Sequence, residues 1–207
     1  MFRLLRAAAC LLVIVGAGVL LYSGYRAWDP FAGARQQAAQ QHLMHSWGAA
    51  KKSAQHASCA ETDNHPRFSR PFAIIRIPAF GPSWRFTIVQ GTGLAQLATG
   101  PGHITGTALP GRAGNTGIAA HDITAGNPFL HLVNLRPGNK IIITTENCVV
   151  TYRVTRSPRK VLNTDVAVLR PTGREHTITL ITCWPVTLYF VPHRIVVPGV
   201  EVSSVPR

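Results

Sequence analysis

A run of β-branched and apolar residues, Thr177-Ile178-Thr179-Leu180-Ile181-Thr182, directly precedes Cys183-Trp184-Pro185 in this chain. Residues of this kind favour a strand that is buried on at least one face. Pro185 lacks the N–H donor that a sheet ladder needs, so the strand should end just before it. Cys183 is therefore predicted at the exit of a strand, on the rim of a sheet or barrel. The alternative is a small buried hydrophobic residue, the commoner state of a free cysteine.

Similar short runs recur from Phe72 onward, separated by Gly, Pro and Asn, as in the turn Leu135-Arg136-Pro137-Gly138-Asn139. They predict further strands at residues 73–77, 85–89, 117–120, 140–145, 149–155 and 195–200. Residues 93–99 and 129–132 are predicted as short helices. Seven or eight strands at this spacing, without long amphipathic helices between them, indicate a mainly β fold, an antiparallel or mixed β-barrel.

The 207 residues include 21 Lys and Arg, 8 Asp and Glu, and carry a net charge of +13. With 46% hydrophobic residues the chain is not fully disordered, and 18 Gly and 15 Pro without a triplet period exclude collagen. The charge suggests nucleic acid or an anionic membrane surface as a partner. Because no aromatic-basic motif or groove-reading helix accompanies it, we expect a membrane-proximal barrel and no nucleic-acid partner.

Residues 7–25 contain no charge and are bounded by Arg6 and Arg26. As a helix they would reach about 28 Å, close to the thickness of a bilayer. Arg3 and Arg6 precede the segment, so the positive-inside rule places the N-terminus in the cytoplasm. The alternative is a cleaved signal peptide with a site near Ala32-Gly33-Ala34, which lies far beyond the apolar run. We expect an uncleaved anchor, and a single-pass membrane protein with its folded part outside the membrane.

The chain thus divides into a cytoplasmic N-terminus and anchor (1–25), an extracytoplasmic stalk or linker (26–70) and a β-barrel domain (71–207). The stalk is rich in Gln, Ala and His, and part of it could be a short helix. Its histidines lack the carboxylate or thiolate spacing of a metal site and are expected to be solvated: His42, His45, His56 and His65.

The four cysteines are Cys10, Cys59, Cys148 and Cys183, and none of them forms a C-x-x-C pair. This pattern favours neither a zinc site nor a dense disulfide framework. Cys10 falls in the predicted anchor and Cys59 in the linker, where it could be free or cross-link to another chain. Cys148 is predicted in a strand, buried and slow to react. The four cysteines look unpaired, but the sequence does not decide whether Cys59 or Cys148 forms a disulfide.

Three reactive residues interrupt otherwise ordinary strand sequence. Cys183 ends one strand, His121 follows the predicted strand 117–120, and Arg194 opens the last strand. A thiol needs a nearby histidine to take its proton and to return it to a leaving amine. A fixed guanidinium can stabilise the oxyanion of a tetrahedral intermediate. The three residue types suffice for acyl transfer without a metal or other cofactor, although each also has an ordinary structural role.

The segment Thr179-Leu180-Ile181-Thr182-Cys183 resembles the TLxTC signature of sortases, the membrane-anchored cysteine transpeptidases. Further similar segments follow the family order: Gly100-Pro101-Gly102-His103-Ile104, Gly106-Thr107-Ala108-Leu109-Pro110-Gly111, and Gly114-Asn115-Thr116-Gly117-Ile118-Ala119-Ala120-His121. Leu135-Arg136-Pro137-Gly138 and Cys183-Trp184-Pro185 look most like class D sortases. The resemblance extends from about Phe72 to Val202.

The resemblance implies a closed eight-stranded β-barrel in which the Cys and Arg strands are neighbours. It makes Cys183 the nucleophile, His121 the general acid/base and Arg194 the oxyanion or substrate-positioning residue. The implied substrate is a protein with an LPxTG-like sorting motif, cut after Thr, and the implied acceptor is an amine of a cell-wall precursor or a protein Lys. Four residues near Cys183 are expected to touch the substrate: Thr182, Trp184, Leu188 and Tyr189.

Several departures from the family pattern qualify this assignment. Ala120 stands where many relatives have Gly, and Asp122 directly follows His121. Arg170 and Arg174 are alternatives to Arg194, but neither begins a strand after Cys183. Asp29-Pro30-Phe31 is similar to the lid motif of class C sortases, yet it lies beside the anchor and is interpreted as a juxtamembrane turn.

The remaining acidic residues are scattered, so no calcium site is expected: Asp122, Glu146, Asp165 and Glu175. The rival hypothesis is a non-catalytic, membrane-anchored β-barrel that binds an anionic envelope polymer. A papain-like hydrolase fits badly, because its cysteine should open a helix near the start of the mature domain.

Overall fold

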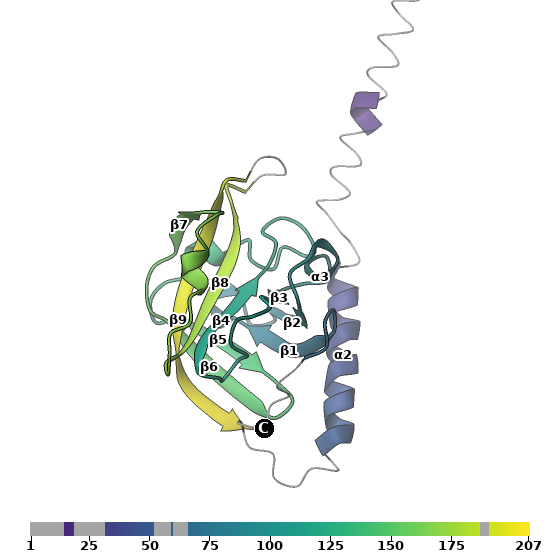
Figure 1. The fold of residues 1–207 in the computed structure, drawn as a ribbon. Helices are drawn as coiled ribbons and strands as arrows, with labels where there is room; N and C mark the ends of the chain where they lie inside the picture. The colour runs from purple at the N-terminus through teal and green to yellow at the C-terminus, as the bar shows by residue number, and fades with distance from the viewer. Residues whose placement is uncertain (1–14, 19–31, 52–58, 60–65, 187–190) are drawn as a thin grey trace, which may run out of the picture.

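The computed structural model describes residues 15–18, 32–51, 59, 66–186 and 191–207 (Figure 1). The predicted anchor at residues 7–25 falls mostly outside them, and among the described residues no helix is long and apolar enough to cross a membrane. The anchor therefore stays a prediction.

Nine strands and a few helices make up the described fold. The strands are β1 (Pro71–Arg76), β2 (Arg85–Gln90), β3 (Gly102–His103), β4 (Gly114–Ala119), β5 (Lys140–Thr144), β6 (Cys148–Val154), β7 (Arg159–Leu162), β8 (His176–Trp184) and β9 (His193–Pro206). The helices are α2 (Ala32–Lys51) and α3 (Leu94–Leu97), with short 3₁₀ turns η2 (Pro78–Phe80), η3 (Leu132–Asn134) and η4 (Val166–Leu169).

The strands form one sheet in the order β6-β5-β1-β2-β3-β4-β8-β9-β7, and pairing of β6 with β9 closes it. Eight strands therefore form the closed barrel. The ninth strand, β7, pairs with the first half of β9. Most neighbours are antiparallel, but β2 with β3 and β4 with β8 are parallel. The expectation of a mixed, closed, eight-stranded barrel is confirmed.

Alternation along β8 explains how the barrel is filled. Ile178 and Leu180 are fully buried and belong to the core cluster, together with Val197 of β9. The intervening residues Thr177, Thr179 and Ile181, and then Cys183, point to the outer face of the sheet, because successive side chains of a strand alternate. The outer face of β8 is thus where the predicted nucleophile lies.

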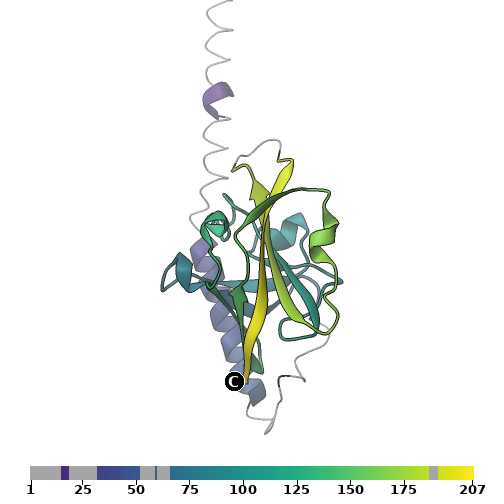
Figure 2. The ribbon, with the colours of Figure 1, turned by 90° about the vertical axis from the view of Figure 1, so that its left-hand side faces the viewer.

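Helix α2 corrects the expectation of a solvated stalk. It lies along one side of the barrel in both views (Figures 1 and 2) and buries Gln36, Leu43 and Trp47. Gln36 accepts hydrogen bonds from the Thr87 N–H and hydroxyl, at 2.8 and 2.9 Å, and donates to the carbonyl of Thr99. His42 and His45 are exposed, as expected. The assignment of residues 26–70 as a separate unit stays a prediction.

The structure answers a question about the cysteines that the sequence left open. Cys59 and Cys148 form a disulfide that spans 89 residues of sequence. Cys148 is 1% exposed and packs in the core, as predicted, but it is not a free thiol. Spacing could not reveal this pair, because the two cysteines meet only after the chain returns from α2 to the barrel. Among the described cysteines, Cys183 is the free one.

All seven predicted strands are present; their boundaries shift by at most three residues, except that β9 extends six residues beyond its predicted end, to Pro206. The predicted helix at 93–99 is the four-residue α3, and at 129–132 the chain instead makes a turn that leads into η3. Strands β3 and β7 were not predicted, because β3 has only two residues and β7 begins with Arg159-Lys160.

Candidate active site

Cys183 and Arg194 face each other across two neighbouring strands. In the antiparallel pairing of β8 with β9, Cys183 is the register partner of Arg194 and Trp184 that of His193. Side chains at paired positions share one face of a sheet, with Cβ atoms about 5 Å apart. The Arg194 guanidinium donates from Nη1 to the carbonyls of Val191 and His193, at 3.1 and 2.9 Å. The backbone thus holds the guanidinium beside the thiol.

His121 follows β4, the strand that neighbours β8 on the side away from β9. Strand β4 runs parallel to β8, and Ala119 pairs with Ile181. Continuing that register by two residues brings His121 level with Cys183. The next backbone bond supports this extension, because the Ala120 N–H donates to the Ile181 carbonyl at 3.1 Å. In the strand order β4-β8-β9 the cysteine is therefore flanked by the histidine strand and the arginine strand.

Thr182 lies on the face of β8 opposite to Cys183. It is 5% exposed, and its hydroxyl donates to the Ala120 carbonyl at 2.9 Å. This contact joins β8 to the residue before His121, so Thr182 fixes the relative position of two site strands. Trp184 is half-buried and packs against the core. Leu188 and Tyr189, the other two residues expected to touch the substrate, lie outside the described residues.

Burial governs the electrostatics of the thiol and the imidazole. It lowers the pKa of His121, and the neighbouring Asp122 carboxylate raises it in part. Burial raises the pKa of Cys183; Arg194 acts against this shift, and Asp122 adds to it. Both groups are therefore mainly uncharged near neutral pH, as thiol and imidazole.

Asp122 belongs to this cluster, although sequence reasoning noted it only as a departure after His121. Its side chain is 4% exposed; Oδ1 accepts from the Ile123 N–H at 2.9 Å, and the buried Oδ2 has no partner. Burial raises the pKa of Asp122, whereas backbone N–H groups, His121 and Arg194 lower it. The signal in the sequence was its position next to a candidate base, but burial of the carboxylate could not be predicted from that.

The structure separates the two alternative arginines from the thiol. Arg170 follows η4, and Arg174 lies in the turn before β8; both are exposed. Arg194 is the arginine that the β8–β9 register places opposite Cys183. Among the described residues, no group of three or more His, Cys, Asp or Glu side chains is arranged to hold a metal ion.

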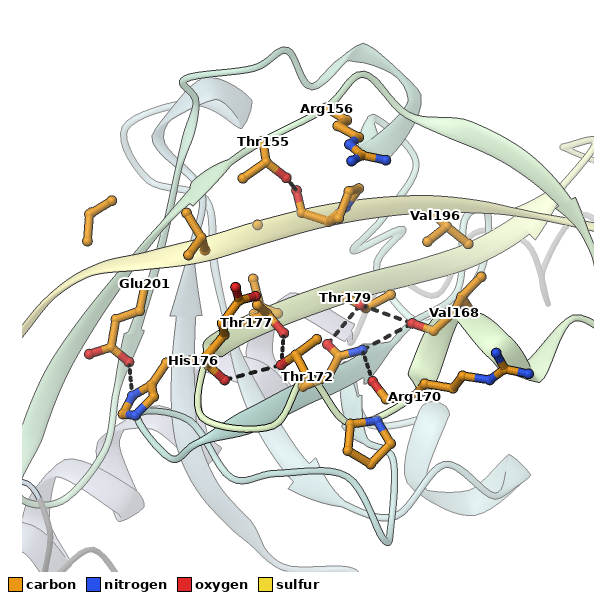
Figure 3. Close-up of a pocket in the computed structure, with 18 of the residues that line it drawn as sticks. Thr155, Arg156, Val168, Arg170, Thr172, His176, Thr177, Thr179, Val196 and Glu201 are labelled. Carbon is orange, nitrogen blue, oxygen red and sulfur yellow. Dashed lines mark hydrogen bonds and ion pairs between the residues drawn. The ribbon is translucent and has the colours of Figure 1, made fainter.

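A pocket of about 1000 Å³ lies on the same outer face of the sheet (Figure 3). Its floor includes Thr177 and Thr179 of β8 and Val196 of β9, and Val168 of η4 forms part of one wall. Asn115 of β4 fixes that wall, since its side-chain N–H donates to the Val168 carbonyl at 3.0 Å and its Oδ1 accepts from Thr179 at 2.9 Å. The pocket therefore lies on the outer face of β8, the strand that carries Cys183.

Comparison with known proteins shows the family of this chain. Residues 75–202 match the family model described as "Sortase domain". The chain belongs to the sortase family. It is 27% identical to Sortase SrtE1 of Streptomyces coelicolor over 98% of this chain, and it spans 58% of the length of that relative.

Two solved sortases are also similar in fold and sequence. Sortase E from Streptomyces avermitilis is 33% identical, with a TM-score of 0.62 over 68% of this chain and 93% of that one. Sortase E1 from Streptomyces coelicolor, solved with a tripeptide in its active site, is 28% identical, with a TM-score of 0.60 over 69% of this chain and 94% of that one. Because these relatives are sortases of class E, the class D likeness stays a prediction.

Proposed function

We propose that this sortase is a cysteine transpeptidase that cleaves an LPxTG-like sorting motif after Thr and transfers the acyl group to an amine. One observation carries the proposal: Cys183 at the end of β8 is the register partner of Arg194 on one side and level with His121 on the other. A nucleophile, a base and a fixed cation on one face are the groups that acyl transfer requires.

In the first half-reaction, His121 takes the proton from the Cys183 thiol as Sγ attacks the carbonyl carbon of the motif's Thr. The tetrahedral oxyanion forms beside the Arg194 guanidinium, whose charge and N–H donors stabilise it. When the intermediate collapses, the C–N bond breaks and His121 gives its proton to the leaving amine. The product is a thioester on Cys183 and a free C-terminal fragment.

In the second half-reaction, an acceptor amine attacks the thioester carbonyl. His121 removes a proton from the amine nitrogen, a new C–N bond forms, and the C–S bond breaks. The sulfur leaves as thiolate and takes the proton from His121, which restores the starting state. Water can replace the amine in the same step and then gives slow hydrolysis.

The expected substrates are a protein that carries the sorting motif and an amine from a cell-wall precursor or a protein Lys. Thr179 and Ile181 precede Cys183 on the outer face of β8, and Thr179 also lines the pocket of Figure 3. Peptide binding in the active site of the Streptomyces coelicolor relative supports this class of substrate.

We propose that the domain works outside the cytoplasm, held by a membrane anchor at residues 7–25. The disulfide between Cys59 and Cys148 supports this location, since disulfides persist in oxidising compartments. The basic residues before the anchor and the uncharged stretch itself support the orientation.

The test uses the full chain in detergent with a fluorogenic LPxTG peptide, with and without an amine acceptor. We expect cleavage after Thr, an acyl-enzyme adduct on Cys183 by intact-mass spectrometry, and a ligated product when the amine is present. Cys183→Ala should abolish all three. Full turnover by Cys183→Ala would refute the mechanism.

A further inference from the structure

The pocket beside β8 carries arginines that the reaction itself does not use. Arg156 lies in the loop after β6, Arg159 begins β7, and Arg170 follows η4. Figure 3 shows Arg156 and Arg170 on opposite sides of the strands that form the floor. Arg159 pairs with Val196, so it is near the end of the pocket that is closer to Cys183. Three basic side chains thus surround one half of the pocket.

These guanidinium groups have no partners within the part of the chain that the structure describes. All three arginines are exposed, and no ion pair or side-chain hydrogen bond involves any of their guanidinium groups. Two carboxylates line the same pocket, Glu175 and Glu201. Glu201 is already engaged, because its Oε2 lies 3.0 Å from His176 Nδ1. The Thr155 N–H, next to Arg156, donates to the Pro198 carbonyl, which is level with Thr179 of β8. Around Thr179 the pocket therefore presents uncompensated positive charge.

Strand geometry relates this charge to the reacting thiol. Thr179 lies four residues before Cys183 on the same face of β8, about 13 Å away, and Thr177 lies about 20 Å away. An extended peptide advances by the same rise per residue. We number the substrate residue that is acylated on Cys183 as position one and count upstream from it. In a substrate that lies extended along β8, positions five to seven then lie over this pocket.

The pocket can contribute to both half-reactions only if it binds the acyl part of the substrate. That part stays bonded to Cys183 through both half-reactions, whereas the other fragment departs after the first. In a motif of four residues ending at the acylated Thr, positions five to seven precede the motif. Carboxylate side chains there would meet the three guanidinium groups, and Arg pairs well with carboxylates.

We propose that this pocket recognises acidic side chains in the three residues that precede the sorting motif, through Arg156, Arg159 and Arg170. The inference rests on the proposed function, because it places the acyl chain on Cys183. It adds a specificity determinant outside the motif: substrates with an acidic approach to the motif are selected over those with a neutral or basic one.

A binding experiment tests the pocket without requiring turnover. The Cys183→Ala chain is titrated with fluorescent peptides that end in the same LPxT sequence and differ only in three preceding glutamates, glutamines or lysines. We expect the glutamate peptide to bind about tenfold more tightly than the glutamine peptide, from three exposed ion pairs that each contribute modestly. The preference should shrink as salt is raised.

Two triple variants with the same change in net charge distinguish binding at the pocket from general electrostatic attraction. Replacing Arg156, Arg159 and Arg170 by Gln should reduce the preference to about twofold or less. A control with the same change of charge replaces three exposed arginines outside the pocket, Arg76, Arg136 and Arg153, and should keep the preference. Equal binding of the glutamate and glutamine peptides, or equal losses in the two triple variants, would overturn the proposal.

Two further outcomes are informative. If the peptides show the arginine-dependent preference but the unmodified chain cleaves none of them, the pocket assignment stands and the proposed chemistry fails. If a soluble polyphosphate polymer binds through the same arginines more tightly than the glutamate peptide does, the pocket is a site for an envelope polymer and the proposal is overturned.

Discussion

At the scale of single residues, the thiol of Cys183 lies between opposite influences. Arg194 favours the thiolate, Asp122 opposes it, and burial opposes it most. The three catalytic candidates could be predicted from residue type and strand position, because each stands where a β-branched run ends or begins. Asp122 could not be assigned this influence from sequence, since it depends on burial and on the proximity of β4, β8 and β9.

Removing the negative charge of Asp122 and removing the positive charge of Arg194 should change the reactivity of Cys183 in opposite directions. Asp122→Asn removes a negative charge and should lower the thiol pKa, so that iodoacetamide reacts faster at neutral pH. Arg194→Gln removes the positive charge and should raise the thiol pKa and slow the reaction. The measurement is the alkylation rate against pH, with Arg136→Gln as an exposed control. If both variants shifted the pKa of the Cys183 thiol in the same direction, Asp122 and Arg194 would not have opposite effects on the thiol.

The pH dependence of kcat/KM follows from the same directions. The His121 pKa is lowered from its ordinary value of 6.5, and the Cys183 pKa is raised from 9.0. The one-proton state of the pair dominates between the two pKa values, because it is lost to protonation below the first and to deprotonation above the second. A plot of kcat/KM for peptide cleavage against pH should therefore be a broad bell, with its acid limb below pH 6.5 and its alkaline limb above pH 9.0.

The Asp122→Asn variant tests whether the acid limb of this profile reports the pKa of His121. The Asp122 charge raises the His121 pKa, so its removal should move the acid limb to lower pH. A narrow bell that lies entirely between 6.5 and 9.0 would be inconsistent with the burial of both groups.

At the scale of elements, long β-branched runs were predictable, and short or charged strands were not. The sequence of β8 predicts its strand, its end before Pro185 and the place of Cys183 at the strand's exit. The outward direction of Cys183 follows only from the burial pattern of β8 in the structure. Strand β3 is held by its neighbours, because Gly102 and His103 pair with both β2 and β4. Helix α2 was expected to be a solvated stalk because its composition is polar; of its side chains that the structure describes, three are buried, Gln36, Leu43 and Trp47.

Gln36 makes the buried polar contacts between α2 and the barrel, and Gln40 adds an exposed hydrogen bond to the Arg85 carbonyl at 3.2 Å. Gln36→Ala would leave the buried Thr87 N–H without its acceptor, so we expect the free energy of unfolding to fall by about 1–3 kcal/mol. Gln37→Ala, at an exposed position one residue further, should change it by less than about 0.5 kcal/mol. Urea unfolding of the two variants measures the difference. Equal effects would show that α2 is not held through Gln36.

At the scale of the whole molecule, the disulfide between Cys59 and Cys148 connects the segment after α2 to the barrel core. A crosslink that closes so long a loop restricts the unfolded chain, typically by about 2–4 kcal/mol. Cys59→Ala should lower the free energy of unfolding by that amount, and reductant should then have no further effect. Reductant should still destabilise the Cys183→Ala chain. Insensitivity of the unmodified chain to reductant would contradict the crosslink.

The order of the cysteines gives the disulfide a further consequence during biogenesis. If the domain is exported with its N-terminal side first, Cys59 emerges before Cys148, and both emerge before Cys183. Oxidation in order of emergence therefore joins the structural pair while the nucleophile is still inside the cell. The barrel in turn cannot close until residues 199–206 of β9 reach β6. If the proposed export is correct, vectorial delivery would thus protect the reactive thiol from mispairing and delay its activity until the domain has left the export channel.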